Sequence, residues 1–197
     1  NMDVLVSGTI FLGKMVEPVS STKNPYSKME MGVPYTHTPK FLQFDYRLVA
    51  PAGAPIYSSG FGSKKKLSGR DNAEVFVLLQ RRWEDAKGNI HAERVGTGRE
   101  RFGKTTMGWV NKHRIPIWYG DIRHHAGYKS FMGLIPKEKS YYARNSKGKM
   151  KPVIEEKWAP VGTKPTHVLV MLSSGCGTAY TGTVGMTLWV DNVAFVH

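Results

Sequence analysis

The chain has 197 residues, of which 41% are hydrophobic and 11% aromatic, so it can form one domain with a proper core and is not a disordered tail. No stretch approaches 18 consecutive apolar residues, which excludes a transmembrane helix. The 28 Lys and Arg against 15 Asp and Glu give a formal net charge of +13, so we expect an anionic partner: nucleic acid, acidic glycan, phospholipid or cell wall.

Seven segments carry patterns typical of β-strands. In residues 41–49, apolar side chains alternate with polar ones, which predicts a strand with one buried face. The polar turn 85–89 separates two further strand-like segments and predicts a hairpin. Residues 166–173 have the pattern of a central strand that is buried on both faces. In chain order, the predicted strands are residues 3–12, 41–49, 74–83, 90–102, 113–119, 166–173 and 187–196.

The connections between these strands are rich in glycine and proline. The chain holds 21 Gly and 11 Pro, more than average usage, and no segment shows a capped helical stripe. Residues 13–39, 51–70 and 120–165 are predicted as long loops, and no repeat or linker divides the chain. We therefore predict one domain over residues 1–197, an all-β sandwich of jelly-roll type with little helix.

The motifs of several function classes are absent. The single Cys176 allows no intramolecular disulfide, and no standard metal or nucleotide motif occurs. Asp121, His124 and His125 lie close in sequence, but surface histidines near arginine explain them better than a transition-metal site. The basic residues are dispersed and no RNA- or DNA-binding motif accompanies them, so no nucleic-acid partner is expected.

Aromatic residues in loops and at strand edges point to sugars. A sugar ring presents an apolar face to an aromatic plane while its hydroxyls need polar neighbours. One short segment combines both kinds of side chain, and two further rings are weaker candidates. The predicted ligand-binding residues are Trp118, Tyr119, Asp121 and Tyr128, with Trp109 and Tyr57 as the weaker pair. The alternative is that these rings only fix long loops to the sandwich.

The last third of the chain carries a resemblance. Residues 158–167 lead into a strand, Ser173-Ser174-Gly175 follows it, and spaced glycines in 180–185 precede the segment 188–193. This order resembles the "putative carbohydrate metabolism domain" family of Bacteroidetes envelope lipoproteins, and Ser7-Gly8-Thr9 resembles the family's opening strand. The resemblance implies a jelly roll like those of carbohydrate-binding modules (galactose-binding-like) and an extracytoplasmic location. It carries no catalytic residues over to this chain.

The expected function is therefore a non-catalytic carbohydrate-binding or glycan-utilisation domain of an envelope lipoprotein, at the cell surface or in the periplasm. The net charge favours an acidic glycan, and a membrane would be reached only through a lipid anchor. Because Asn1 is not an initiator residue, we expect residues 1–197 to be excised from a longer secreted or lipid-anchored chain. Two alternatives remain open: a structural or adhesive module, and a small glycoside hydrolase or lyase using carboxylates on the concave sheet. The acids on or beside the predicted strands are Asp45, Glu74, Glu93 and Asp121.

The closing strand contains a further candidate site. Leu188 and Val190 share one face, so Trp189 and Asp191 share the other, and a buried carboxylate needs a partner. The resemblance implies a calcium ion held by Asp191, with an N-terminal acid such as Asp3 or Glu17 as a further ligand. No other cofactor is expected. The alternative is structural: Asp191 accepts hydrogen bonds or pairs with an arginine, and replacing it by Ala would cost roughly 2–4 kcal/mol.

Overall fold

The protein is nearly all β, as the sequence predicts. The computed structural model describes residues 4–16, 24–60 and 63–197, with 51% strand and no helix of seven or more residues among them. The helices described are three short 3₁₀ turns, η1 (Pro25–Lys28), η2 (Ser130–Met132) and η3 (Lys137–Lys139). None of the helices in these ranges is long and apolar enough to cross a membrane.

Two sheets form a sandwich. The larger runs in the order β1-β14-β8-β9-β13-β12-β3-β2, with β11 beside β9 and β4 beside β14. Its strands are β1 (Thr9–Phe11), β2 (Gly13–Met15), β3 (Met29–Met31), β4 (Val33–Pro34), β8 (Ala73–Glu84), β9 (Ile90–Phe102), β11 (Trp118–Tyr119), β12 (Tyr142–Arg144), β13 (Met150–Trp158) and β14 (His167–Ser173). The smaller sheet has the order β10-β5-β16, from β10 (Val110–Pro116), β5 (Phe41–Val49) and β16 (Thr187–Val196). A third sheet joins β15 (Thr181–Gly182), β6 (Ile56–Gly60) and β7 (Ser63–Leu67).

The main core lies between the large sheet and the sheet β10-β5-β16, which we call the three-stranded sheet from here on. The alternation along β5 sends four apolar side chains inward, and they meet inward-facing residues of β8 and β14. These residues are Leu42, Phe44, Tyr46 and Leu48 on β5, Val75, Val77 and Leu79 on β8, and Val168, Val170 and Leu172 on β14. The predicted one-sided burial of residues 41–49 is therefore confirmed.

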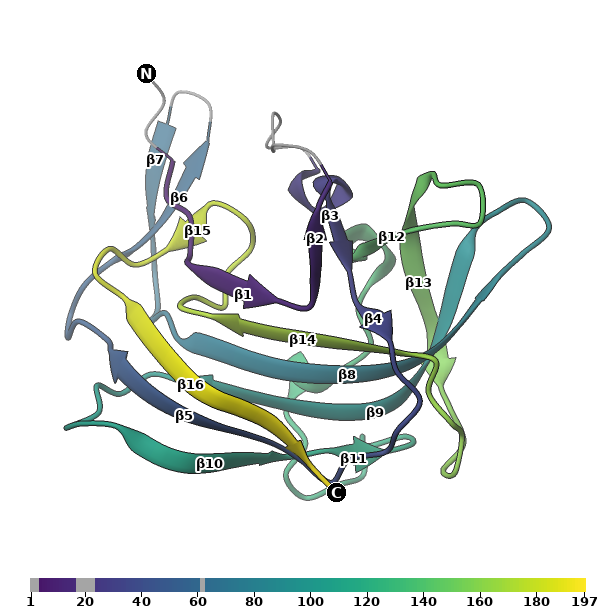
Figure 1. The fold of residues 1–197 in the computed structure, drawn as a ribbon. Coiled ribbons are helices and arrows are strands. Elements are labelled where there is room, and N and C mark those ends of the chain that lie inside the picture. The colour runs from purple at the N-terminus through teal and green to yellow at the C-terminus, as the bar shows by residue number, and fades with distance from the viewer. Residues whose placement is uncertain (1–3, 17–23, 61–62) are drawn as a thin grey trace.

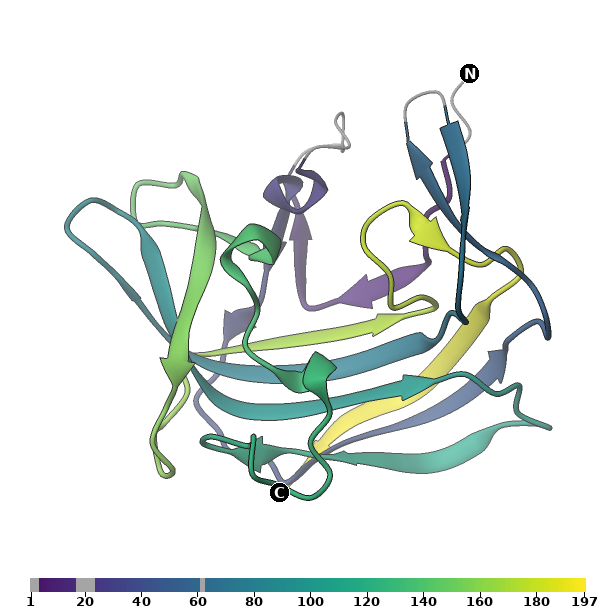
Figure 2. The same cartoon turned by 180° about the vertical axis from the view of Figure 1, so that it is seen from behind.

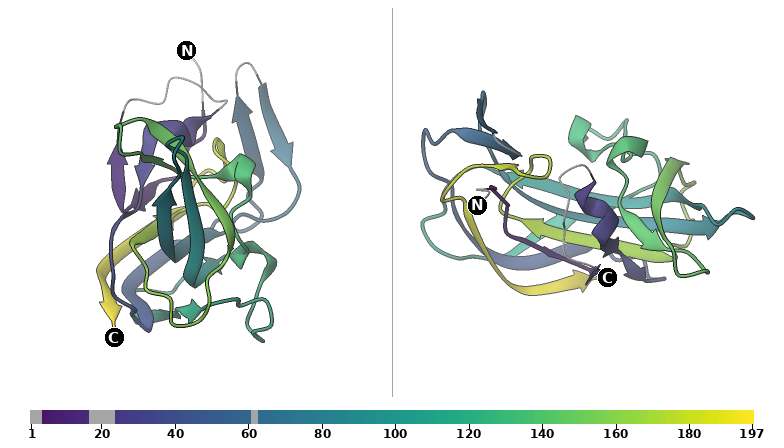
Figure 3. Two further views of the ribbon diagram at one scale, coloured as in Figure 1. Left: turned by 90° about the vertical axis from the view of Figure 1, so that its right-hand side faces the viewer. Right: turned by 90° about the horizontal axis from the view of Figure 1, so that it is seen from above.

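The opposite face of β8 and β14 is also covered. Phe76, Leu78 and Leu169 are fully buried there with Met31 of β3, and Tyr141 packs against them. The three-stranded sheet lies on one side of the large sheet, and β2, β3, β12, β13 and the β6–β7 hairpin rise from the other (Figure 1). Figures 2 and 3 show this two-sided arrangement from behind, from one side and from above. The prediction that residues 166–173 are buried on both faces is confirmed, because β14 has apolar neighbours on each.

A buried ion pair fastens β13 to β9. Arg94 of β9 binds both carboxylate oxygens of Glu155 on β13, and neither side chain is exposed to solvent. Gln80 donates to Glu155 Oε1 at 2.6 Å, and the backbone N–H of Ile135 donates to Oε2 at 2.8 Å. Burial by itself would raise the pKa of Glu155, but the charge of Arg94 and these hydrogen bonds hold it below its ordinary value.

Four expectations about strands and loops are corrected first. The predicted loop 13–39 contains β2, β3 and β4, which are too short to show an alternating pattern. Within the predicted strand 3–12, only Thr9–Phe11 is strand among the described residues. The predicted loop 51–70 contains the β6–β7 hairpin, whose lysine-rich β7 hides any apolar alternation. The predicted loop 120–165 contains β12 and β13, and β13 escaped detection because its inward-facing residues include the charged Glu155.

A fifth correction concerns the predicted strand 113–119, which is two strands in different sheets. β10 ends at Pro116, the N–H of Ile117 donates to the carbonyl of Lys40, and β11 then pairs with β9. The chain can cross here because β9 carries Gly98, where a Cβ atom would lie 2.9 Å from the carbonyl oxygen of Pro116. The two sheets therefore come into close contact at the end of β10.

The buried ion pair predicts a large loss of stability on substitution. Replacing Arg94 with Met leaves the Glu155 charge buried without its partner, so we expect the free energy of unfolding to fall by about 3–5 kcal/mol in urea titrations. Because the folded pKa of Glu155 lies below the unfolded value of about 4.3, the pair's contribution is present above that pH and is lost as the pH falls further.

The control is Lys87→Gln, which removes an exposed charge in the turn after β8. It should unfold like the wild type at pH 7. Equal urea midpoints for Arg94→Met and the control would contradict the assignment of the ion pair as a main support of the fold.

Candidate functional site

A pocket of about 390 Å³ lies at the edge of β9. One edge of β9 is paired with β13 at Ile90 to Arg94 and with β11 at Gly96 and Thr97. In the described part of the chain, residues 98–102 of β9 pair only with β8, on the other edge. The walls come from β9, from the β10–β11 crossing and from residues 127–132. The lining residues are Thr97, Arg99, Glu100, Arg101, Ile115, Pro116, Trp118, Gly127, Lys129, Phe131 and Met132.

Trp118 forms one wall of the pocket. It pairs directly with Thr97, so its side chain shares the face of β9 that carries Arg99 and Arg101. The ring of His125 stacks on the indole with centroids 3.7 Å apart and planes 23° apart. A Cβ atom on Gly127 would lie 2.6 Å from Cη2 of the indole, so only glycine leaves room for the ring at this point.

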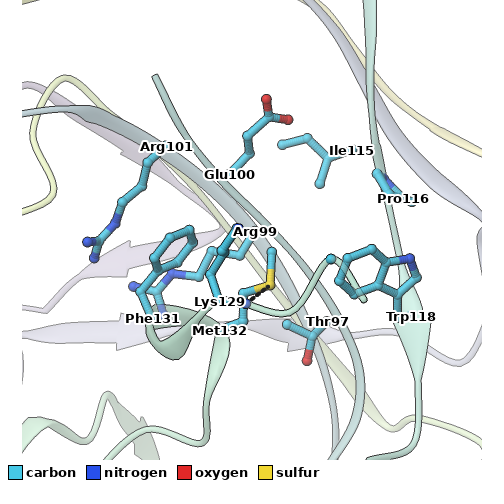
Figure 4. A pocket seen from close by; sticks show the side chains of 11 residues that line it. Thr97, Arg99, Glu100, Arg101, Ile115, Pro116, Trp118, Lys129, Phe131 and Met132 are labelled. Carbon is cyan, nitrogen blue, oxygen red and sulfur yellow. Dashed lines mark hydrogen bonds between the residues drawn. The ribbon is translucent and has the colours of Figure 1, made fainter. Parts of the chain in front are cut away.

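The other wall is an arginine cluster around a buried carboxylate. Glu74 is 2% exposed and accepts three hydrogen bonds: from Arg99 Nε at 3.1 Å, Arg99 Nη2 at 3.0 Å and Arg101 Nε at 2.7 Å. Two guanidinium groups share one carboxylate, which leaves the cluster net positive. Phe131 lies beside Arg99 and Arg101, opposite Trp118 (Figure 4), and the Arg101 guanidinium is 4.3 Å from the Phe131 ring centre.

These contacts leave Arg101 with donors for a ligand. Its side chain is 30% exposed, and in the described ranges only Nε has a protein hydrogen-bond acceptor. A guanidinium carries five N–H donors, so its two terminal nitrogens can bind a carboxylate, a sulfate or sugar hydroxyls in the pocket. Lys129, exposed at the rim, adds a second positive charge.

The structure separates the four leading sequence-predicted residues. Only Trp118 lines the pocket. Tyr119 points to the main core and donates to the Pro39 carbonyl at 2.6 Å, and burial raises its pKa. Asp121 is exposed, and hydrogen bonds and charge from Arg123 lower its pKa to about 2. Tyr128 is half-buried outside the lining residues.

The two weaker predicted residues also lie elsewhere. Trp109 is 49% exposed and precedes β10, at the opposite end of that strand from Trp118. Tyr57 lies on β6 in the third sheet, where the ammonium group of Lys64 is 4.3 Å from its ring centre. Neither contributes to the pocket.

Sequence reasoning missed the basic half of the pocket. Thr97, Arg99 and Arg101 occupy alternate positions of a predicted strand, and this spacing was the available signal that they share one face. Lys129 and Phe131 carried no such signal, because only the fold brings residues 127–132 over the edge of β9.

The expectation that Asp191 is buried is wrong. Asp191 is exposed and accepts a hydrogen bond from the N–H of Asn192 at 2.7 Å. Among the described residues no cluster of three or more His, Cys, Asp or Glu could hold a metal ion, and the proposed co-ligands Asp3 and Glu17 lie outside those residues. The alternation was read correctly, but the face that carries Asp191 is the outer face of the sandwich.

Asp45 of β5 pairs directly with Asp191 across the two strands. Asp45, and not Asp191, accepts the hydrogen bonds that support the structure here. Its carboxylate accepts the N–H of Lys112 at 2.5 Å and the side-chain amide of Asn192 at 2.7 Å. Both partners have positive φ values, 54° and 50°, at irregular pairings in β10 and β16. These hydrogen bonds, the one from Lys112 first, lower the pKa of Asp45.

We therefore expect Asp45 and Asp191 to differ in thermal unfolding. Asp45→Ala removes the acceptor for both strained partners and should lower the melting temperature, whereas Asp191→Ala should leave it nearly unchanged. Differential scanning calorimetry at pH 7 measures both. A larger loss for Asp191→Ala than for Asp45→Ala would refute the assignment.

A second prediction concerns the orientation of Trp118. Gly127→Ala places a methyl group against the indole and should displace it, which changes the near-ultraviolet circular dichroism of the folded protein. The matched control is Gly108→Ala, because nothing lies within 4 Å of a Cβ atom there. Identical spectra for Gly127→Ala and the wild type would show that the indole is not confined by this glycine.

Comparison with solved structures finds the same fold in two larger proteins. The crystal structure of a "putative glycoside hydrolase" from Bacteroides thetaiotaomicron VPI-5482 matches over 97% of this chain and 47% of its own, with a TM-score of 0.60 and 19% identity. A "putative glycoside hydrolase" from Bacteroides vulgatus ATCC 8482 matches over 96% and 64%, with a TM-score of 0.55 and 16% identity. The chain thus spans about half the length of the first and just under two thirds of the second.

Comparison with protein-family models finds no match to this chain. Comparison with the sequences of curated proteins finds no match either. At identities of 19% and 16%, the likeness to the two Bacteroides proteins concerns the fold.

Proposed function

We propose that this chain is a non-catalytic carbohydrate-binding domain, and that the pocket at the edge of β9 is its glycan site. The observation that carries the proposal is the pairing of an aromatic wall, Trp118, with a wall of positively charged hydrogen-bond donors, Arg101 and Lys129. An indole offers a sugar ring a stacking surface, and a guanidinium binds hydroxyls or an acidic substituent. The names of the two Bacteroides proteins support a role with carbohydrates.

An acidic glycan suits this pocket best. The only carboxylate among the lining residues is Glu100, whose Oε2 lies 2.8 Å from Nε2 of His113. The Arg99–Arg101 cluster keeps an excess positive charge after pairing with Glu74, and the whole chain carries +13. A uronate or sulfate group would therefore meet complementary charge.

A glycoside hydrolase is the second candidate, because both structural neighbours bear that name. Hydrolysis by paired carboxylates needs the two acids roughly 5–10 Å apart. The two buried carboxylates on the covered face of the large sheet are those of Glu74 and Glu155. Glu155 is hydrogen-bonded to Gln80. Gln80 lies six residues from Glu74 on β8, or about 20 Å at 3.3 Å per residue, so the two carboxylates are too far apart for this mechanism. Both carboxylates are also bound by arginine, which favours binding over this mechanism.

The cellular setting forms part of the same proposal. The resemblance to domains of envelope lipoproteins supports a place at the cell surface or in the periplasm, within a longer protein with a lipid anchor. Secretion to that compartment would bring the domain into contact with environmental or envelope glycans.

The test is a glycan array that includes uronate-containing and sulfated glycans, followed by calorimetric titration with the best binder. Trp118→Ala should weaken binding by about 1–3 kcal/mol, on the scale known for stacking of nucleobases, and Arg101→Gln should reduce the preference for acidic glycans. The matched control is Trp83→Ala, since Trp83 is 40% exposed on β8 and lies outside the pocket.

The outcomes separate the candidate functions. Binding that depends on Trp118 without product release supports the proposal. Release of reducing sugar, abolished by Glu74→Gln, would support the hydrolase. No binding to any glycan on the array would leave the structural or adhesive module as the better account.

A further inference from the structure

The outer face of the three-stranded sheet carries two exposed tryptophans in one row. β5 lies between β10 and β16, and the three strands run side by side (Figure 1). Trp189 of β16 pairs directly with Arg47 of β5. On the other side of β5, Val110 pairs with Tyr46, and Trp109 directly precedes Val110 at the start of β10. Trp109, Arg47 and Trp189 thus come from three neighbouring segments of this sheet, and we call them the row Trp109–Arg47–Trp189.

All three side chains point away from the core. Tyr46 and Val190 pack into the core, and consecutive residues of a strand point to opposite faces, so Arg47 and Trp189 point outward. Trp109 lies just before β10, next to Val110, which packs against the core. The exposures agree with this: Trp109 is 49% exposed and Trp189 is 42% exposed. Neither indole lies in the pocket beside Trp118.

The spacing of the row suits an extended glycan. Adjacent strands lie about 4.8 Å apart, so the positions of the two tryptophans are about 10 Å apart with Arg47 between them. One strand spacing is close to the length of one sugar unit in an extended chain. Three consecutive units lying across the strands would place the outer two over the indoles and the middle one over Arg47.

The positive charge of Arg47, between the two tryptophans in the row, favours an acidic sugar as the middle unit. The Arg47 guanidinium lies 5.2 Å from the centre of the Trp189 ring, and among the described residues no carboxylate lies within 4 Å of its nitrogens. Two acids lie nearby on this face: Asp45 is bound to Lys112 and Asn192, and Asp191 accepts the N–H of Asn192. Arg47, whose guanidinium lies over the Trp189 ring, thus has both charge and donors for an acidic substituent beside that ring.

The row also has a rigid support. Asp45 sits on β5 two residues before Arg47 and bonds to irregular points of both neighbouring strands. These bonds hold the backbones of β10 and β16 against β5 on both sides of Arg47. A preformed surface avoids the ordering cost that a flexible one would pay on binding.

We propose that the row Trp109–Arg47–Trp189 is a second glycan-binding surface, which takes an extended oligosaccharide with an acidic unit between two neutral ones. This surface and the pocket on β9 use different side chains and different sheets. Each can therefore succeed or fail on its own.

The experiment is affinity electrophoresis of the whole chain through gels that contain hyaluronan, unsulfated chondroitin or polygalacturonate, with neutral xyloglucan for comparison. The first two polymers alternate acidic and neutral units, as the row requires. The wild type should be retarded most by one of these two. Trp109→Ala with Trp189→Ala should weaken that binding about five- to a hundredfold, the range expected for loss of stacking.

Three variants make the result specific. Arg47→Gln should remove the preference for the alternating acidic polymers over xyloglucan, whereas Lys87→Gln, which removes an equally exposed charge, should not. Trp118→Ala tests the pocket and should leave binding to this row intact. Circular dichroism of the double variant verifies that it is folded, as expected for outward-facing positions.

The proposal is overturned if neither hyaluronan nor unsulfated chondroitin retards the wild type. It is also overturned if the double tryptophan variant runs like Lys87→Gln in both gels. If Trp118→Ala alone removes binding, the pocket is the glycan site and the row is not. If only the row variants lose binding, the row stands, and the pocket is judged separately by the effect of Trp118→Ala on the glycan array.

Discussion

Burial of two strands on both faces is the constraint on which the rest of this structure depends. β8 and β14 are neighbours in the large sheet, and apolar side chains leave each of them in both directions. A sheet covered on both sides has no solvated face on which to leave polar groups. The three-stranded sheet therefore covers one side, while β3 and the segment before β12 cover the other.

Because both faces of β8 are covered, the side chains of Glu74 and Gln80, towards its two ends, are buried, and each needs a hydrogen-bond or ion-pair partner. Glu74 at one end of β8 binds Arg99 and Arg101. Gln80 towards the other end joins Glu155 and Arg94. Unpaired, these charges would carry a desolvation cost that a domain of marginal stability could not absorb. The same pairing leaves a net positive wall where β9 has no second neighbouring strand, and the pocket lies beside it.

β10 connects the two surfaces proposed to bind glycans. Trp109 precedes this strand and faces outward, while Trp118 follows the crossing at Pro116 and Ile117 and faces the pocket. Because the chain changes sheets at that crossing, two tryptophans nine positions apart come to lie on different sides of the sandwich. A domain with aromatic surfaces on two sides could hold separate segments of a glycan, and such bivalent contact raises the overall affinity without any new kind of interaction.

Local sequence patterns were enough to predict three of the strands with their observed bounds. Residues 41–49, 90–102 and 187–196 form strands with the predicted bounds, and the all-β sandwich follows from them. Local patterns suffice for residues 41–49 and 187–196 because one face meets the core and the other is more exposed, whereas residues 90–102 are buried on both faces and were located by the polar turn 85–89 before them. Local patterns fail for β7 and β13, where lysines and a buried glutamate interrupt the apolar pattern.

Which side chains meet depends instead on strand order and sheet packing. The sequence placed Trp118, Tyr119, Asp121 and Tyr128 in one site because they are close along the chain. Adjacent strand residues point to opposite faces, so Trp118 entered the pocket and Tyr119 the core. Asp191 was correctly assigned to the face opposite Leu188, but whether that face is covered depends on sheet packing, and here it lies on the outside. Contacts between segments as distant as Arg101 and Phe131, or Arg47 and Trp189, arise from strand order and register, which no local pattern encodes.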